Sequence, residues 1–167
     1  MTARPVWLGV AACLALAAPP RPAMLWNTTA SVPVGLYGLS PARALRPGDL
    51  VVVRPEPALA RTLAEAGWLP AGVPLLKPVA ARAGDTVCRV RERVLISGRE
   101  VAVALTHDAR GRLLPRWSGC RRLGPDEVFL LSGAPGSLDG RYFGPTDRRS
   151  ILARAAPIWT ASPEVRR

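Results

Sequence analysis

The sequence predicts a single, mainly β domain, and its length and composition support this prediction. The chain has 167 residues, of which 49% are hydrophobic, so one domain with its own core is expected. Its 18 prolines and 15 glycines are too many for a helical bundle. They punctuate short runs rich in β-branched residues, which is typical of β-rich folds. No internal repeat or low-complexity tract divides the chain.

Residues 1–22 are predicted to form an apolar leader or membrane anchor ahead of the domain at residues 23–167. After Arg4, the run from Val6 to Ala18 carries no charge. Thirteen helical residues rise about 20 Å, less than the roughly 30 Å of a bilayer's hydrocarbon core. The run therefore fits a signal-peptide core or a marginal anchor, and either would place the rest of the chain outside the inner membrane.

Other interpretations of this N-terminal region stay open. The small residues at 15–17 have the spacing of a cleavage site, and Cys13 loosely fits a lipoprotein-type site, although the apolar run continues past it. The segment also fits a buried N-terminal helix of a cytosolic domain. Residues 24–26, which include Trp26, fit either a membrane interface or the core, because tryptophan has an apolar ring and a polar N–H.

From residue 45 onward, turn signals alternate with short apolar runs. Residues 45–49 predict a turn, and Ala58 to Ala66 has helical composition with Gly67 as its stop signal. A hairpin is expected around Gly98-Arg99. The expected strands are residues 50–53, 75–81, 86–90, 94–97, 100–103, 127–131 and 150–159.

The net charge of +11 arises almost wholly from arginine, because only one of the 23 basic residues is a lysine. Such an excess indicates nucleic acid, an anionic membrane surface, or an arginine-rich surface with no partner. Arg89, Arg91 and Arg93 alternate in an expected strand and would share one face. They lack the interleaved aromatic residues of a single-strand nucleic-acid platform. We therefore expect the inner-membrane surface as a partner, and no nucleic acid.

Ser31 is the candidate nucleophile, and Lys77 is its candidate base. A serine becomes nucleophilic only when a neighbouring group takes its proton. The lysine is the only one in the chain, and arginines cannot deprotonate at usable pH. Apolar residues at 75, 76, 79 and 80 would lower its pKa by burying it. A surface lysine whose stem lies on an apolar patch is the alternative.

Three motifs in order resemble those of a known superfamily of proteases. Residues 29–37 fit T-x-S-x-P-x-G-L-Y, residues 77–85 read K-P-V-A-A-R-A-G-D, and residues 137–144 read S-L-D-G-R-Y-F-G. They resemble the nucleophile, lysine and C-terminal boxes of the signal peptidase superfamily of Ser/Lys proteases. Within it, the chain is most similar to the conjugal-transfer branch of TraF-type pilin-processing peptidases. The resemblance implies a signal-peptidase-like fold of antiparallel sheets.

The resemblance also implies roles for single residues. The serine would attack the scissile carbonyl, and the lysine would take and return the proton. Thr29 and the N–H of Ser31 would form the oxyanion hole. Ser137 would orient the lysine amine. Asp139 would support catalysis and, as in general signal peptidases, pair with Arg141, whereas a turn aspartate that caps backbone donors is the alternative.

The expected function is that of a membrane-associated serine endopeptidase of the inner membrane's periplasmic face or the periplasm. Resemblance to the TraF-type branch implies a prepilin or another exported precursor as substrate, and either hydrolysis or cyclisation by the pilin's own amine. Pro78 and residues 133–136 depart from the pattern of general signal peptidases, which stay an alternative. A catalytically silent scaffold of a conjugation or secretion apparatus is another. A self-cleaving repressor would need a DNA-binding domain, for which 26 leading residues leave no room.

The remaining chemistry-bearing residues are expected to be structural. A Ser-His-Asp triad would have to use His107, the only histidine, which lies with Asp108 in a polar, loop-like run, and no serine occupies a G-x-S-x-G elbow. One histidine and no paired-cysteine spacing argue against zinc, so no metal and no cofactor are expected. Cys88 and Cys120 would form a disulfide in an oxidising compartment, with two buried thiols as the alternative.

Overall fold

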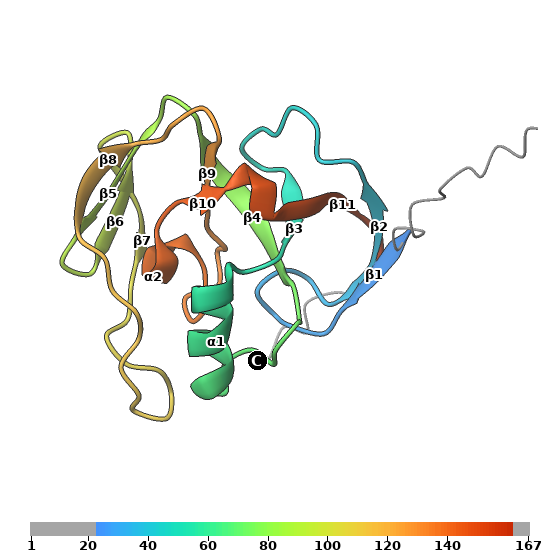
Figure 1. The fold of residues 1–167 in the computed structure, drawn as a ribbon, viewed down its shortest axis with the longest axis horizontal. Coiled ribbons are helices and arrows are strands. Elements are labelled where there is room, and N and C mark those ends of the chain that lie inside the picture. The colour runs from blue at the N-terminus through green and yellow to red at the C-terminus, as the bar shows by residue number, and fades with distance from the viewer. Residues whose placement is uncertain (1–22, 162–167) are drawn as a thin grey trace, which may run out of the picture.

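Two antiparallel sheets lie side by side in the structure, with one helix packed below them and a second, very short helix between them (Figure 1). The computed structural model describes residues 23–161, so the predicted leader at residues 1–22 and the last six residues lie outside the described part. The expectation of a mainly β, antiparallel fold is confirmed. None of the helices within residues 23–161 is long and apolar enough to cross a bilayer.

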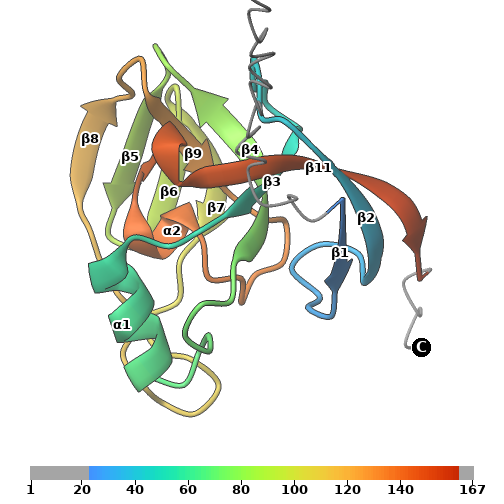
Figure 2. The ribbon, with the colours of Figure 1, turned by 45° about the vertical axis from the view of Figure 1, so that its right-hand side comes forward.

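The larger sheet has seven strands and joins the two ends of the described chain. Its spatial order is β1 (Met24–Asn27), β2 (Gly35–Ser40), β11 (Ile151–Thr160), β3 (Leu50–Val53), β4 (Leu75–Arg82), β9 (Glu127–Leu130) and β10 (Thr146–Asp147). A 3-10 turn, η1 (Arg148–Ser150), leads into β11. β11 is the longest strand, and a register shift against each neighbour lets it curve between β2 and β3 (Figure 2).

The smaller sheet has four strands and continues directly from β4. Its order is β7 (Arg99–Val103), β6 (Arg93–Ile96), β5 (Thr86–Val90) and β8 (Gly119–Arg122). Gly84 turns the chain from β4 into β5 at a φ of 93°, which glycine adopts without steric cost. Cys88 and Cys120 lie opposite each other on β5 and β8 and form a disulfide, with 4.0 Å between their Cα atoms.

The two helices are placed by proline, glycine and close packing. α1 (Pro57–Glu65) starts with a proline in its first turn, and the chain leaves it at Gly67 with a φ of 65°. Its Leu63 is fully buried. α2 (Gly140–Phe143) is a single turn that packs against β9 so closely that a Cβ on Gly140 would lie 2.6 Å from the carbonyl oxygen of Leu130.

β3 and β4 are covered on both faces, and this burial shapes the site. Val51 and Val53 belong to one buried cluster, whereas Val52 and Leu76 belong to another on the opposite face. A third cluster fills the space between the small sheet and α2. A side chain in the middle of β4 is therefore removed from water whichever way it points.

The expected helix and all seven expected strands lie within one residue of their predicted ends. The prediction that Arg89, Arg91 and Arg93 share one face of a strand is wrong. Arg89 is buried at the end of β5, Arg91 lies in the following turn with a φ of 58°, and Arg93 begins β6. The turn breaks the alternation because one residue in left-handed conformation reverses the chain.

Candidate active site

Lys77 lies in the middle of β4, opposite Val51 of β3, and only 4% of its surface is exposed. Its Nζ atom donates a hydrogen bond to Ser137 Oγ at 2.9 Å. Burial lowers the pKa of this amine to about 8, while the Asp139 carboxylate opposes that shift and the Arg141 guanidinium reinforces it. The lysine is therefore partly neutral near pH 8, as a general base must be.

The Asp139–Arg141 ion pair is present and buried beside the lysine. Arg141 Nε lies 2.8 Å from Asp139 Oδ1, with side chains 2% and 0% exposed. The same carboxylate oxygen accepts the backbone N–H of Arg141 and so caps α2. Asp139 Oδ2 accepts the N–H of Ser132 at 2.9 Å. Both descriptions of this aspartate, ion-pair partner and capping residue, thus apply at once.

Backbone carbonyls of the preceding turn complete the environment of Arg141. Its guanidinium donates to the carbonyls of Ser132 and Pro135. The turn at residues 133–136 departs from the polar run of general signal peptidases, and here its main chain binds the arginine. A buried guanidinium has five N–H donors to satisfy, so the carbonyls reduce the cost of its burial.

Contacts from the small sheet and its long loop hold α2 in place. Arg89 donates to the carbonyl of Arg141 at 2.6 Å and lies over the ring of Tyr142, 5.8 Å from its centroid. Trp117 Nε1 donates to the carbonyl of Gly140 at 2.9 Å. Burial lowers the pKa of Arg89, which remains a cation that carbonyl groups and an aromatic face stabilise.

Ser31 lies in the loop between β1 and β2, and Asn27 organises that loop. The Asn27 amide nitrogen donates to the carbonyls of Thr29, Val32 and Pro33 at 2.8, 3.2 and 3.1 Å. Its oxygen accepts the N–H and the hydroxyl of Thr29 at 3.1 and 2.9 Å. One buried amide therefore binds both limbs of the loop, and Ser31 stays half-exposed at its tip.

The Thr29 hydroxyl donates its proton to Asn27 within this loop. The oxyanion role that the resemblance implies for Thr29 would require that hydroxyl to rotate towards a bound substrate. Thr29 is exposed, so its side chain has the freedom to rotate.

Ser132 connects the serine loop to the lysine network. Its hydroxyl donates to the carbonyl oxygen of Ser31, while its N–H binds Asp139. The structure thus brings Lys77, Ser137 and Asp139 together directly and joins Ser31 to them through Ser132. A cavity of about 300 Å³, walled on its far side by α1, opens onto Lys77 and Asp139 and leaves room for water beside the amine.

Sequence reasoning missed Asn27 and Ser132. Asn27 offered a signal, because an asparagine just before a turn commonly binds backbone groups of that turn. Ser132 offered none, since the residue whose carbonyl it binds lies 101 positions away. The triad alternative has no geometric support: His107 is exposed and contacts Thr106, whereas Asp108 binds Trp68 and Arg112.

The family model of signal peptidase, peptidase S26, matches residues 3–160 of this sequence. The chain belongs to the S26 signal peptidase family. It is 33% identical over 162 residues to the plasmid transfer protein TraF of Escherichia coli, covering 91% of each chain. It is 38% identical over 150 residues to the probable conjugal transfer protein TraF of Sinorhizobium fredii, covering 82% of this chain and 77% of that protein. The resemblance carried by the three motifs is thereby confirmed.

A crystal structure of a signal peptidase I from Enterococcus faecalis is a structural neighbour. The two share 16% sequence identity over 67% of this chain and 97% of that one, with a TM-score of 0.38. The superposition is partial, and membership of the S26 family rests on the sequence matches.

Proposed function

We propose that this S26 family member is a serine endopeptidase that uses a Ser31–Lys77 dyad. The observation that supports it most is the state of the lysine, which is buried, bound to Ser137 and lowered in pKa to about 8. An amine on the surface would stay charged at that pH and could not accept a proton. Burial of the only lysine in the chain beside a second serine has no comparable structural purpose, because it costs stability.

The proposed reaction assigns one step to each of these residues. Ser31 Oγ attacks the scissile carbonyl as its proton passes to the neutral amine of Lys77, which Ser137 orients. The Ser31 N–H and the Thr29 hydroxyl stabilise the oxyanion that develops. The tetrahedral intermediate collapses when the lysine returns the proton to the leaving amine. Asp139 holds the turn that carries Ser137 in a fixed position relative to the lysine amine.

The proposed substrate is a prepilin or another exported precursor used in conjugal transfer. Support comes from relatives that are themselves named as plasmid or conjugal transfer proteins. The acyl-enzyme formed with Ser31 has two possible acceptors. Water would give a shortened pilin, and the amine of the pilin's own N-terminus would give a cyclic one.

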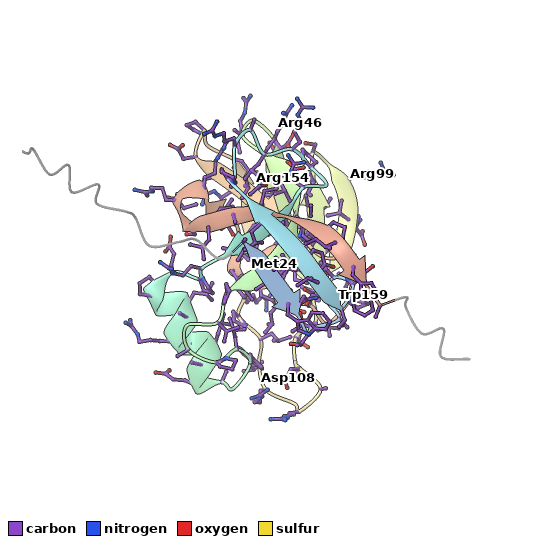
Figure 3. The ribbon with its side chains drawn as sticks, turned by 90° about the vertical axis from the view of Figure 1, so that its right-hand side faces the viewer. Met24, Arg46, Arg99, Asp108, Arg154 and Trp159 are labelled. Atoms are coloured by element: carbon purple, nitrogen blue, oxygen red, sulfur yellow. A yellow bond between two sulfur atoms is a disulfide. The ribbon has the colours of Figure 1, made fainter. Side chains whose placement is uncertain are left out.

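The proposed location is the periplasmic face of the inner membrane, for two reasons. The Cys88–Cys120 disulfide fits an oxidising compartment. Met24 and Trp26 of β1 and Ile158 and Trp159 of β11 are each more than half exposed. The register places them together across β2, and the two tryptophan rings stack with centroids 5.8 Å apart. Figure 3 labels Met24 and Trp159 on this side of the molecule. Stacked tryptophans beside other exposed apolar residues are suited to a membrane interface.

Co-expression of the full chain with the precursor pilin of a conjugation system tests the dyad. Intact mass spectrometry of the pilin should show processing with the wild-type chain and none with Ser31→Ala or Lys77→Ala. Ser118→Ala, an exposed serine in the loop before β8, is the matched control and should process normally. Wild-type processing by either dyad variant would contradict the dyad, and equal processing in cells that lack the chain would favour the silent scaffold.

The location has its own test. Protein isolated from cells without reduction and alkylated should show no free thiol at Cys88 or Cys120, and external protease should reach the chain in spheroplasts. Alkylation of both thiols would show that the disulfide is absent, and the location would lose the support that the disulfide gives it. Protection from protease would favour a cytosolic domain.

A further inference from the structure

We propose that Ser132 is a positioning residue that fixes the orientation of Ser31. Through Ser132, the Asp139–Arg141 ion pair would fix the position of Ser31 relative to Lys77. The proposal rests on the proposed function and names a residue that none of the three motifs contains. Ser132 lies between β9 and the turn at residues 133–136, and 3% of its surface is exposed.

Every polar group of Ser132 is used. Its N–H donates to Asp139 Oδ2 at 2.9 Å, and its carbonyl accepts from the Arg141 guanidinium. Its Oγ accepts the N–H of Ala134 at 3.2 Å and donates to the carbonyl oxygen of Ser31. The backbone of Ser132 is therefore fixed by the ion pair, while its side chain reaches the serine loop.

The Ser132 hydroxyl acts as the donor in its hydrogen bond to Ser31, and this direction matters for the proposal. A serine hydroxyl has one proton and two lone pairs. Because the Ala134 N–H occupies one lone pair, the proton is directed to the other side, where the Ser31 carbonyl lies. A carbonyl fixed in this way restrains the peptide that follows Ser31, and with it the direction in which Oγ projects.

This restraint complements that of Asn27. The asparagine binds the carbonyls of residues 29, 32 and 33, on both sides of the nucleophile, and leaves the carbonyl of Ser31 to Ser132. The two contacts together fix the half-exposed tip of the loop. A displacement of about 1 Å in a reacting group costs on the order of 100-fold in rate.

The Ser132 side chain makes no hydrogen bond to Lys77, and this separates the proposal from a general effect on the site. Loss of the hydroxyl should change where Ser31 points without changing the proton affinity of the lysine. The rate at saturating substrate should therefore fall, while the pH at which the lysine titrates should stay in place.

The test compares Ser132→Ala, Ser132→Thr and the wild-type full chain, with Ser118→Ala as control and the precursor pilin as substrate. We expect Ser132→Ala to lower kcat about 10- to 100-fold with KM and the midpoint of the pH profile unchanged. Ser132→Thr keeps the hydroxyl and should recover at least part of the lost rate. In hydrogen exchange, amides of residues 28–34 should exchange faster in Ser132→Ala, and those of β4 should not.

Three results would overturn the proposal. The first is an unchanged kcat and unchanged exchange at residues 28–34 in Ser132→Ala. The second is faster exchange throughout the domain, which would indicate a purely structural role. The third is a moved pH midpoint, which would indicate action through Lys77. Failure of the dyad itself is distinguishable, because Ser31→Ala would then retain activity while the exchange measurement still reports the loop contact.

Discussion

The two halves of the candidate site are built in opposite ways. On the lysine side, Lys77, Ser137, Asp139 and Arg141 are each at most 5% exposed, and an ion pair joins two of them. On the serine side, Thr29 is exposed, Ser31 is half-exposed, and neutral hydrogen bonds from Asn27 shape the loop. A base made by desolvation must be buried, whereas a nucleophile must be reachable by a protein substrate.

The difference also separates the energetic roles of the two sides. Burial of Lys77 opposes folding whenever the amine would otherwise be charged, and the surrounding polar network limits that cost. The serine loop carries no such penalty, because its groups are neutral and its hydrogen bonds are local. We therefore expect mutations on the lysine side to change the pH dependence of activity, and mutations on the serine side to change the rate without moving the pH midpoint.

The largest contrast should appear between Lys77→Met and Ser31→Ala. Both should lower kcat by at least about 10³-fold. At pH 7, Lys77→Met should raise the free energy of unfolding by roughly 1 to 3 kcal/mol, since a lysine lowered from 10.5 to about 8 carries up to that penalty. Ser31→Ala should change it by less than about 0.5 kcal/mol.

The sign of this effect can be checked against pH by urea denaturation. The folded chain releases the Lys77 proton near pH 8, and the unfolded chain releases it near 10.5. Between these values the unfolded state binds more protons, so wild-type stability rises with pH and the advantage of Lys77→Met shrinks. An advantage that stays constant from pH 7 to pH 11 would contradict the burial argument.

A smaller effect is expected from Asn27→Ala, which removes five hydrogen bonds from the serine loop. We expect kcat to fall on the order of 100-fold, because the loop loses its shape, while the pH midpoint stays near 8. Kinetics on the precursor pilin across pH 6 to 10 would measure both. A moved midpoint would show that the two sides are not separable.

Asp139→Asn should mainly change the midpoint of the pH–activity profile, and not the maximal rate. Wild-type activity should rise along a single acidic limb with a midpoint near pH 8, as Lys77 becomes neutral. The Asp139 carboxylate raises the pKa of Lys77, so its neutralisation should move the midpoint to lower pH. Circular dichroism should verify folding, and a midpoint that moves upward would contradict the assignment of charges.

The smallest effect is expected from His107→Ala. The ring is exposed and contacts only its neighbour Thr106 among the described hydrogen bonds. Activity and the pH midpoint should stay within about twofold and 0.2 units of wild type. Loss of activity with an intact fold would point to a histidine mechanism. The contrast between the lysine side and the serine side would then not describe the active site.

Local patterns in the sequence were sufficient for most of the fold. Runs such as residues 50–53 and 86–90 are bounded by turn residues and became strands at the expected positions. β8 and β10 were not predicted because Arg121, Arg122 and Asp147 give no apolar alternation, and these strands form by pairing with β5 and β9. β1 and β2 were not predicted either, and they form by pairing with each other and with β11. α2 is too short for any helical period and depends on the cap from Asp139.

The motifs were sufficient to name candidate residues, but not to predict contacts between residues that are distant in the sequence. Ser31, Lys77 and Ser137 were identified from their boxes, and so was the Asp139–Arg141 pair. The depth of burial of Lys77 depends on β3 pairing with β4 and on the turn that brings Ser137 to the amine, which local sequence does not encode. The Ser132 contact depends on a β9 turn meeting the β1–β2 loop, and only the assembled fold brings them together.

The disulfide also affects what would happen if the backbone were cut. Cys88 and Cys120 are 32 positions apart, and the exposed loop around His107 lies between them. Nicking of that loop would leave Ser31 and Lys77 on one fragment and Ser137 and Asp139 on the other, with the bond between the cysteines still joining them. The disulfide thus keeps the two fragments covalently joined after a break in this exposed loop, and they would lose that link only if the disulfide were also reduced.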